Sequence, residues 1–223
     1  MKKIAIMTAG GDCAGLNAAI KSVVMAASKN NIVVVGIIDG FIGFVERKYM
    51  VLDNKIVENI ERQGGTILGS SNKECPFHYP SKEKKDEYED RVDDSIKALR
   101  KIGVEAMIII GGDGTLDSAR VIDEAGMPTI GIPKTIDNDM VASNPTIGFD
   151  TGVENAVEAI RKLKTTAASH RRVMVVEMMG RTSGYLTLYS GFAAGADIIL
   201  LPERDYDLNI VCNLSLIHIW RCR

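Results

Sequence analysis

The string PKTIDND, residues 133–139, holds the residues with the clearest chemical potential. Its carboxylates, Asp137 and Asp139, stand two residues apart, with Lys134 and Thr135 just before them and an apolar, strand-like run upstream. A hydroxyl that accepts a phosphoryl group needs a carboxylate to take its proton and a cation to balance the developing charge. The string therefore predicts phosphoryl transfer, whereas a lone Asp-Asn-Asp would indicate only a surface turn.

A second cluster is GGDGT, residues 111–115, between a strand-like run and a helix-like run. Its glycines leave room for a polyphosphate, Asp113 offers a hard oxygen ligand suited to Mg²⁺, and Thr115 can donate to a phosphate oxygen. A strand–helix turn with an aspartate cap is the plainer alternative. The motif occurs in several kinase groups without a Walker A loop, so it leaves sugar-phosphate, NAD and diacylglycerol kinases open.

The segment GGDCAGLN, residues 10–17, also follows a strand-like run and opens a helix-like run. Glycines there let backbone N–H groups approach a phosphate, and a helix N-terminus favours an anion. Leu16 stands where a Walker A loop requires lysine, and the spacing is not G-x-G-x-x-G. Alone, this segment is explained nearly as well by a tight turn.

Arginines follow two later segments, in SHRR at 169–172 and MMGR at 178–181. Arg172 and Arg181 suit phosphate capture, because a guanidinium is planar and permanently charged. Without the other motifs, each would more often form a surface ion pair. The sequence identifies no partner for His170, for which we predict a structural role.

The elements that must position these residues alternate between strand-like and helix-like runs. This alternation predicts an α/β fold, an open, doubly wound and mostly parallel sheet with helices on both faces. Ligands bind such sheets at the carboxyl ends of the strands, where the three clusters fall. The expected strands are 3–8, 32–38, 106–110, 129–132, 172–177 and 197–201, and the expected helices are 17–28, 90–101, 116–125, 152–163 and 184–194.

Composition excludes several other classes of protein. The 223 residues are 46% apolar and 25% charged, with a formal net charge of −2 and no basic stripe, which argues against nucleic-acid binding. No apolar run approaches the length of a membrane span, and the run after the N-terminal lysines is too short for a signal peptide. We therefore expect a cytoplasmic protein, with its four cysteines reduced.

Taken together, the motifs resemble those of the 6-phosphofructokinase family. GGDCAGLNAAI, GGDGT, PKTIDND, SHRR, MMGR and LLPE occur in the family's order and approximate spacing, over about residues 2–210. PKTIDND combined with MGR is highly specific for this family. The resemblance implies a phosphofructokinase-like fold and transfer of a phosphoryl group from ATP to the 1-hydroxyl of fructose 6-phosphate.

The resemblance also implies a role for each donor-side residue. Gly11 and the segment Gly112, Asp113, Gly114 and Thr115 would approach the phosphates of the donor, and Asp113 would hold Mg²⁺. Phe41 matches an aromatic position near the donor's base. Many family members carry an arginine that reaches donor phosphates, and here Asn72-Lys73 stands in that region, with Lys73 as a point charge instead.

On the acceptor side, the resemblance implies that Asp137 is the general base, with Lys134 and Asp139 assisting it. Thr135, Ile136 and Asp137 would contact fructose 6-phosphate, and Met179, Gly180 and Arg181 would line the sugar site. Arg172 would reach the sugar phosphate in a neighbouring subunit, which implies a homodimer or homotetramer.

Two positions bear on the choice between ATP and pyrophosphate, and they conflict. In the family, an aspartate at the position of Gly114 accompanies pyrophosphate use, so the glycine removes an obstacle to the α-phosphate of ATP. A lysine at the position of Lys134 is common in pyrophosphate users. We favour ATP, because steric exclusion is harder to evade than a flexible lysine, and a pyrophosphate-dependent enzyme is the alternative.

The expected domains are a donor and Mg²⁺ domain at 1–138, the start of a sugar-phosphate domain at 139–213, and a tail at 214–223. The tail, LSLIHIWRCR, holds the only tryptophan and breaks the preceding pattern, so we interpret it as non-native sequence. Family members continue for roughly another hundred residues, with further sugar-binding side chains. An inactive truncated chain and, more remotely, an NAD- or lipid-kinase-like enzyme are therefore further alternatives.

Overall fold

A computed structural model describes residues 2–71, 75–81, 87–141, 143 and 145–213 of the chain. The expected tail at 214–223 lies outside these described residues. The chain divides into two compact units, Met1–Thr135 (unit 1) and Ile136–Arg223 (unit 2). This division falls three residues before the boundary expected after residue 138, inside the PKTIDND string.

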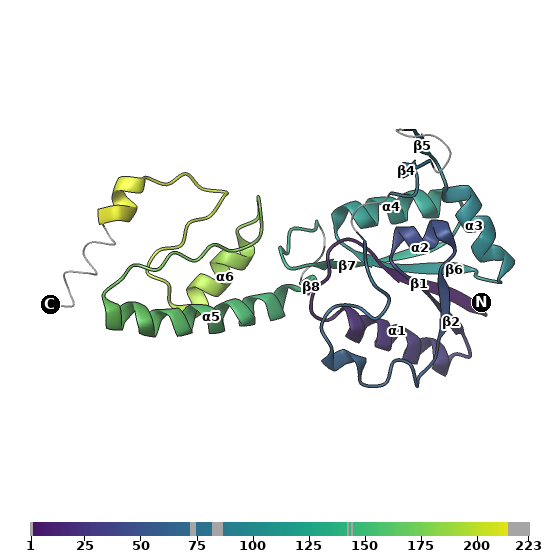
Figure 1. The fold of residues 1–223 in the computed structure, drawn as a ribbon, viewed down its shortest axis with the longest axis horizontal. Helices are drawn as coiled ribbons and strands as arrows, with labels where there is room; N and C mark the ends of the chain where they lie inside the picture. The colour runs from purple at the N-terminus through teal and green to yellow at the C-terminus, as the bar shows by residue number, and fades with distance from the viewer. Residues whose placement is uncertain (1, 72–74, 82–86, 142, 144, 214–223) are drawn as a thin grey trace. The chain divides into compact units, whose positions relative to one another are not determined.

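Unit 1 is built on a twisted sheet whose four inner strands are parallel (Figure 1). Their order is β2-β1-β6-β7, and a fifth strand, β3, pairs with β2 in the antiparallel direction. Thr8 pairs with Ile110 and Ile110 with Ile132, so the ends of three strands lie side by side. The strands are β1 Lys3–Thr8, β2 Val33–Ile37, β3 Tyr49–Leu52, β6 Ala106–Gly111 and β7 Thr129–Thr135.

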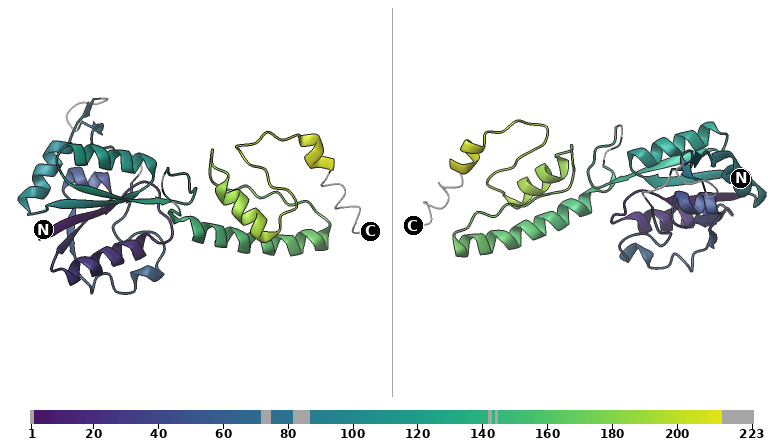
Figure 2. Two further views of the ribbon diagram at one scale, coloured as in Figure 1. Left: turned by 180° about the vertical axis from the view of Figure 1, so that it is seen from behind. Right: turned by 45° about the horizontal axis from the view of Figure 1, so that its top comes forward.

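Helices cover both faces of this sheet, which confirms the predicted α/β architecture (Figures 1 and 2). Helix α1 packs on one face through Leu16, Ile20 and Val24, against Ile4 and Ile6 of the central strand. Three helices cover the other face, against Ala5, Met7, Met107 and Ile109. The bounds are α1 Leu16–Lys29, α2 Phe41–Glu46, α3 Val92–Lys101 and α4 Asp113–Glu124. Alternation of side chains along β1 explains how one strand serves both cores.

Besides β3 and α2, unit 1 has three more short elements that the sequence patterns did not predict. The 3₁₀ helix η1, Ile60–Arg62, packs beside α1. The two-residue strands β4, Tyr79–Pro80, and β5, Tyr88–Glu89, form an antiparallel pair. There the ring of His78 stacks on that of Tyr88 with centroids 3.8 Å apart.

Unit 2 contains two main helices, α5 at Phe149–His170 and α6 at Tyr185–Ala194, preceded by the two-residue strand β8 at Ile147–Gly148. Helix α5 begins three residues earlier and ends seven residues later than the apolar spacing indicated. In the part of the chain that the structure describes, no helix is long and apolar enough to cross a membrane.

The strands predicted at 172–177 and 197–201 are wrong, because neither segment is a strand in the structure. A strand needs a neighbouring backbone to complete its hydrogen bonds, and among the described residues these two segments pair with none. Val175, in the middle of the first segment, is 92% exposed. The apolar runs at 172–177 and 197–201 predicted strands buried in a sheet, but the described part of unit 2 does not form that sheet.

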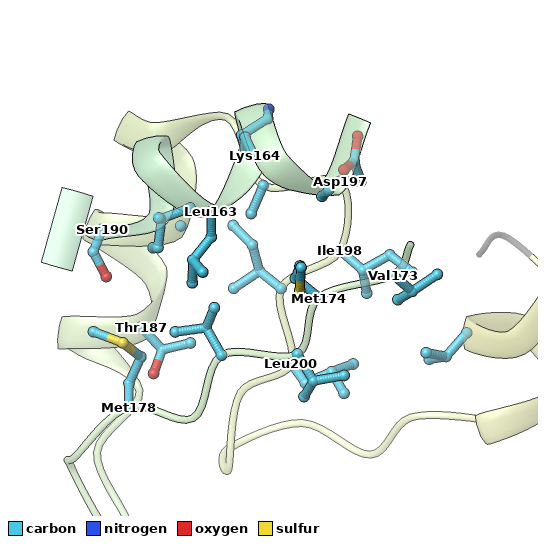
Figure 3. A pocket seen from close by; sticks show the side chains of 18 of the residues that line it. Leu163, Lys164, Val173, Met174, Met178, Thr187, Ser190, Asp197, Ile198 and Leu200 are labelled. Carbon is cyan, nitrogen blue, oxygen red and sulfur yellow. The ribbon is translucent and has the colours of Figure 1, made fainter. Parts of the chain in front are cut away.

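An apolar groove of about 320 Å³ lies between α5, α6 and the same two segments. Leu163, Met174 and Leu200 are among the side chains around it, and Lys164 and Asp197 lie at its edge (Figure 3). Lys164 donates a hydrogen bond to the carbonyl oxygen of Gly195 just past the end of α6. This cation offsets the partial negative charge at the end of that helix.

Candidate functional site

The first part of the candidate site is the turn that follows β1. Gly10 has a left-handed φ of 81°, which favours glycine. Its N–H donates to the carbonyl oxygen of Ser71 at 3.0 Å, and its own carbonyl accepts from Ser70 Oγ at 2.5 Å. Thr8 Oγ1 donates in turn to the carbonyl oxygen of Gly69 at 2.8 Å. Segment 69–71 therefore fixes the turn from one side.

A polar cavity of about 380 Å³ opens beside this turn, lined by Gly10, Gly11, Asp12, Thr66 and Ser70. A Cβ atom built on Gly11 would meet no atom within 4 Å, so the space next to its backbone is open. Glycine turns after a strand expose backbone N–H groups that suit anions. The cavity therefore has the size and polarity for a phosphate-bearing ligand, and the predicted Gly11 lines it.

The second part is the turn from β6 into α4. A Cβ on Gly111 would lie 2.3 Å from Thr115 Cγ2, so only glycine lets the Thr115 side chain pack against this backbone. Thr115 is 7% exposed, whereas Asp113 and Gly114 are exposed at the start of α4. A Cβ on Gly10 would lie 3.2 Å from Thr115 Oγ1, so the two glycine turns are adjacent in space.

Lys134 brings the third motif to the same place. It stands near the end of β7, is only 5% exposed, and donates a hydrogen bond from Nζ to the carbonyl oxygen of Gly11. Burying an ammonium group costs free energy unless the group is paired or hydrogen-bonded, and here a backbone carbonyl accepts a hydrogen bond from it. Lys134 therefore ties the end of β7 to the first glycine turn. Thr135, the next residue, is half-buried.

Cys13 lies in the first turn, where burial and neighbouring charges shift the pKa of its thiol. Burial raises the pKa of its thiol above the ordinary value, the positive charge of Lys134 opposes that rise, and the negative charge of Asp12 adds to it. The thiol donates a weak hydrogen bond to the carbonyl oxygen of Ala14 at 3.2 Å. Cys13 is therefore held mainly in the less reactive, protonated form at neutral pH.

In unit 2, the residues after Thr135 form a turn held by hydrogen bonds. The carbonyl oxygen of Asp137 accepts from Ser183 Oγ at 2.7 Å. Asn138 has a left-handed φ of 50°, and its Oδ1 accepts from the backbone N of Thr146 at 3.1 Å. Asp139 is exposed. Ile136 packs near α5, because a Cβ on Gly152 would lie 3.6 Å from Ile136 Cβ.

The MGR motif forms a tight loop in the same unit. Gly180 is buried, with a φ of 139°, and a Cβ there would lie 2.2 Å from the carbonyl oxygen of Ser183. The N–H of Ser183 donates to the carbonyl oxygen of Gly180 at 2.7 Å. Met179 is 70% exposed and Arg181 is also exposed, so both side chains are accessible to a ligand.

Two residues in unit 2 were not singled out from the sequence. Ser183 contacts Asp137, and Glu203 Oε1 accepts from the N–H of Gly184 at 2.6 Å. Glu203 lies in the LLPE string, which supplied only a family signature, and Ser183 follows MGR by two residues. No sequence pattern identifies either residue, because each hydrogen bond joins segments that are far apart in the sequence.

Some expected site residues are not brought to the cavity. Phe41, the first residue of α2, is 4% exposed and packs in the core, so its contact with a donor base stays a prediction. Asn72 and Lys73 lie outside the described residues. Arg172 is exposed and lies at the apolar groove of unit 2. Within the described residues, no group of three or more histidine, cysteine or acidic side chains could hold a metal ion by itself.

The fold and these turns define an α/β protein with glycine-rich loops at strand ends and without a Walker A lysine. Residues 3–217 match the family model described as Phosphofructokinase, and the chain belongs to the phosphofructokinase family.

Known relatives agree with this assignment. The chain is 47% identical over 212 residues to an "ATP-dependent 6-phosphofructokinase 2" of Clostridium perfringens, covering 94% of this chain and 58% of that relative. The structure of phosphofructokinase from Saccharomyces cerevisiae has a TM-score of 0.85 and 29% identity, over 99% of this chain and 32% of that one.

A pyrophosphate-dependent phosphofructokinase from Nitrosospira multiformis shares the fold alone, with a TM-score of 0.80 at 19% identity, over 99% of this chain and 58% of that one. The fold therefore does not distinguish the two donors. The chain spans somewhat over half the length of the curated relatives it matches.

Proposed function

We propose that the protein containing this chain is a 6-phosphofructokinase that transfers a phosphoryl group from ATP to the 1-hydroxyl of fructose 6-phosphate. The observation that carries the proposal is the meeting of three motifs in unit 1, where Lys134 contacts Gly11 and Thr115 lies beside Gly10. The same PKTIDND string continues directly into Asp137. Curated relatives named ATP-dependent support ATP as the donor.

On the donor side, Gly11, Gly112, Gly114 and Thr115 bind the phosphates in this proposal. Gly10 and Gly11 of the first turn line the polar cavity, the second turn lies beside them, and backbone N–H groups of glycine turns suit phosphate oxygens. Asp113 is exposed at the start of α4, where a carboxylate can reach a metal ion. Mg²⁺ usually takes one or two carboxylates and completes its shell with phosphates and water, so the acidic residues present fit it. The ion would neutralise charge on the transferred phosphoryl group.

On the acceptor side, Asp137 removes the proton of the sugar hydroxyl, and Asp139 and Lys134 support the charges around it. Thr135, Ile136, Met179, Gly180 and Arg181 contact the sugar phosphate in this proposal. Support comes from the exposed side chains of Met179 and Arg181, which are available to a ligand. Phosphoryl transfer depends mainly on positioning and charge stabilisation, so a rigid backbone around Asp137 serves the reaction.

The assembly and location of the protein are also proposals. Arg172 is exposed and forms no ion pair with another of the described residues, so we propose that it reaches a neighbouring subunit in a homodimer or homotetramer. The described residues carry no helix suited to a bilayer, and the net charge of −2 offers no basic surface for nucleic acid. A cytoplasmic glycolytic role fits these properties.

A pyrophosphate-dependent enzyme is the second candidate, and Lys134 is the residue that favours it. In the structure, however, Nζ of Lys134 is buried and donates to the carbonyl of Gly11. A lysine engaged in this way supports the turn, and its presence does not demand a pyrophosphate ligand. Gly114 is exposed with no atom within 4 Å of a built Cβ, which leaves room for the α-phosphate of ATP.

The test is a donor and acceptor matrix on the full-length protein that contains these residues. ATP and pyrophosphate are each offered with fructose 6-phosphate, NAD and diacylglycerol, and fructose 1,6-bisphosphate is measured by a coupled assay. We expect ATP with fructose 6-phosphate to give the highest kcat/KM. Higher turnover with pyrophosphate would establish the second candidate. Phosphorylation of NAD or lipid alone, or no turnover in any combination, would contradict the proposal.

A further inference from the structure

The backbone of Asp137 is held by a side chain from a distant segment. Ser183 lies 46 residues further along the chain, is 8% exposed, and donates from Oγ to the carbonyl oxygen of Asp137 at 2.7 Å. A hydrogen bond to a carbonyl fixes the peptide plane that follows it, and that plane determines the direction of the Asp137 side chain relative to Asn138. The hydroxyl of Ser183 therefore bears on where the carboxylate points.

The other side of the same turn is held as well. Asn138 adopts a left-handed conformation, and its side-chain oxygen accepts from both the N–H and the hydroxyl of Thr146, at 3.1 and 3.3 Å. Thr146 is 3% exposed. An asparagine tolerates this backbone conformation because its short side chain bonds locally. The turn is thus held at Asp137 by Ser183 and at Asn138 by Thr146, both of which are buried hydroxyl residues.

Ser183 is itself placed by the loop that contains the MGR motif. Its N–H donates to the carbonyl of Gly180, and the close approach of its own carbonyl to Gly180 excludes any side chain there. The next residue, Gly184, donates its N–H to Glu203. Loop 180–184 therefore links three segments of unit 2: the turn at Asp137, the MGR motif and the LLPE motif.

We propose that Ser183 is a positioning residue for Asp137. Through it, the proposed base of the reaction is joined to the loop that carries Arg181. It contacts neither donor nor acceptor, and it acts by holding the Asp137 backbone through one hydrogen bond. Sugar binding at Arg181 and placement of the carboxylate are then coupled, because one short loop makes both contacts. This inference rests on the proposed function for its catalytic consequence, but the hydrogen bond itself can be tested without it.

The activity test compares Ser183→Ala with a matched control in the full-length protein. Ser190 is a fully buried serine of the same unit whose hydroxyl donates to the carbonyl of Leu186 within α6, so Ser190→Ala removes a buried serine hydroxyl bond away from Asp137. We expect Ser183→Ala to lower kcat by about tenfold to a hundredfold, since small misplacements of a catalytic group have effects of this size. The KM for ATP should stay within about twofold for both variants, because the loss falls on the placement of the base.

Ser183→Cys keeps nearly the same volume with a weaker donor, so its kcat should lie between those of the wild type and Ser183→Ala. Hydrogen-exchange mass spectrometry then measures the peptide covering 136–140. We expect faster exchange there in Ser183→Ala, with exchange in α5 and α6 unchanged, and no change at 136–140 in Ser190→Ala.

Each other outcome contradicts the positioning role. Equal kcat and equal exchange in the two alanine variants would show that the hydroxyl does not hold Asp137. Faster exchange throughout unit 2 in Ser183→Ala would indicate a general structural role instead. If the wild type does not phosphorylate fructose 6-phosphate, the proposed function fails, and the exchange at 136–140 alone decides whether Ser183 holds the turn.

Discussion

Unit 1 and unit 2 contain the same alternation of apolar runs and amphipathic helices, but they differ in what the apolar runs contact. In unit 1, β1 is paired on both sides and its side chains are buried on both faces. In unit 2, the runs at 172–177 and 197–201 border a groove and leave Val175 almost fully exposed. The residues proposed to bind the donor thus stand on a paired sheet, whereas those proposed to bind the acceptor depend on a few side-chain hydrogen bonds.

This difference shows two ways of placing a reactive group. Lys134 and Thr115 are placed by the register of parallel strands and by the packing of small residues between two turns. Asp137 is placed by Ser183 and, through Asn138, by Thr146. We therefore expect the loss of one hydrogen bond to displace Asp137 more than Lys134 or Thr115, because fewer contacts hold its turn.

The largest effect should come from removing the proposed base. Asp137→Ser should lower kcat of the full-length protein about a hundredfold to ten-thousandfold, the usual range for general-base catalysis. ATP binding should change little, because the donor turns lie in unit 1 and keep their contacts. Calorimetric titration with ATP and steady-state kinetics measure the two quantities separately. Retention of near-wild-type kcat would remove Asp137 from the role of base.

Core substitutions in the two units should differ sharply in their cost. Ile109 is fully buried in the sheet of unit 1, so Ile109→Ala should lower the free energy of unfolding by about 2–5 kcal/mol. Val175→Ala should change it by less than about 0.5 kcal/mol, because the side chain is exposed. Urea denaturation of both variants measures the difference. A large cost at Val175 would show that this side chain is buried by something else in solution.

Gly114→Asp should change donor selection without disturbing unit 1. A Cβ at this position meets no atom within 4 Å, so the variant should fold normally, and the new carboxylate should repel the α-phosphate of ATP. We expect kcat/KM for ATP to fall by at least about tenfold, the effect of roughly 1.4 kcal/mol. The kcat/KM for pyrophosphate should fall less. Gly114→Ala is the control for bulk alone. Equal losses with both donors would show that position 114 does not select between them.

The smallest effect concerns Cys13, which reports on the donor turn. Because burial raises the pKa of its thiol, less thiolate is present at pH 7, and iodoacetamide should label Cys13 several-fold more slowly than the exposed Cys212 of unit 2. Its labelling rate should keep rising with pH through the raised pKa. Peptide mass spectrometry after timed labelling measures both sites, and ATP with Mg²⁺ should protect Cys13 alone. Equal protection of both cysteines would show that the protection does not come from ATP bound at the turn that contains Cys13.

Much of unit 1 could be predicted from residue patterns. The parallel strands, α1, α3 and α4 follow from apolar runs and helical spacing within about three residues of their observed ends. Strand β3 and helix α2 were missed, because short elements have weak periodicity and owe their stability to packing against β2 and the core. Helix α5 ends later than expected because its last turns, near His170, are polar and exposed.

The sequence by itself determined the family, the α/β architecture and the residue types of the candidate site, because glycines, aspartates and lysine occur at strand ends in a specific order. Only the tertiary structure decided which of them meet. It placed Lys134 on the carbonyl of Gly11, buried Phe41 in the core, and brought Ser183 to Asp137 across 46 residues. It also left 172–177 without strand pairing, because an apolar run becomes a strand only where another backbone in the described structure completes its hydrogen bonds.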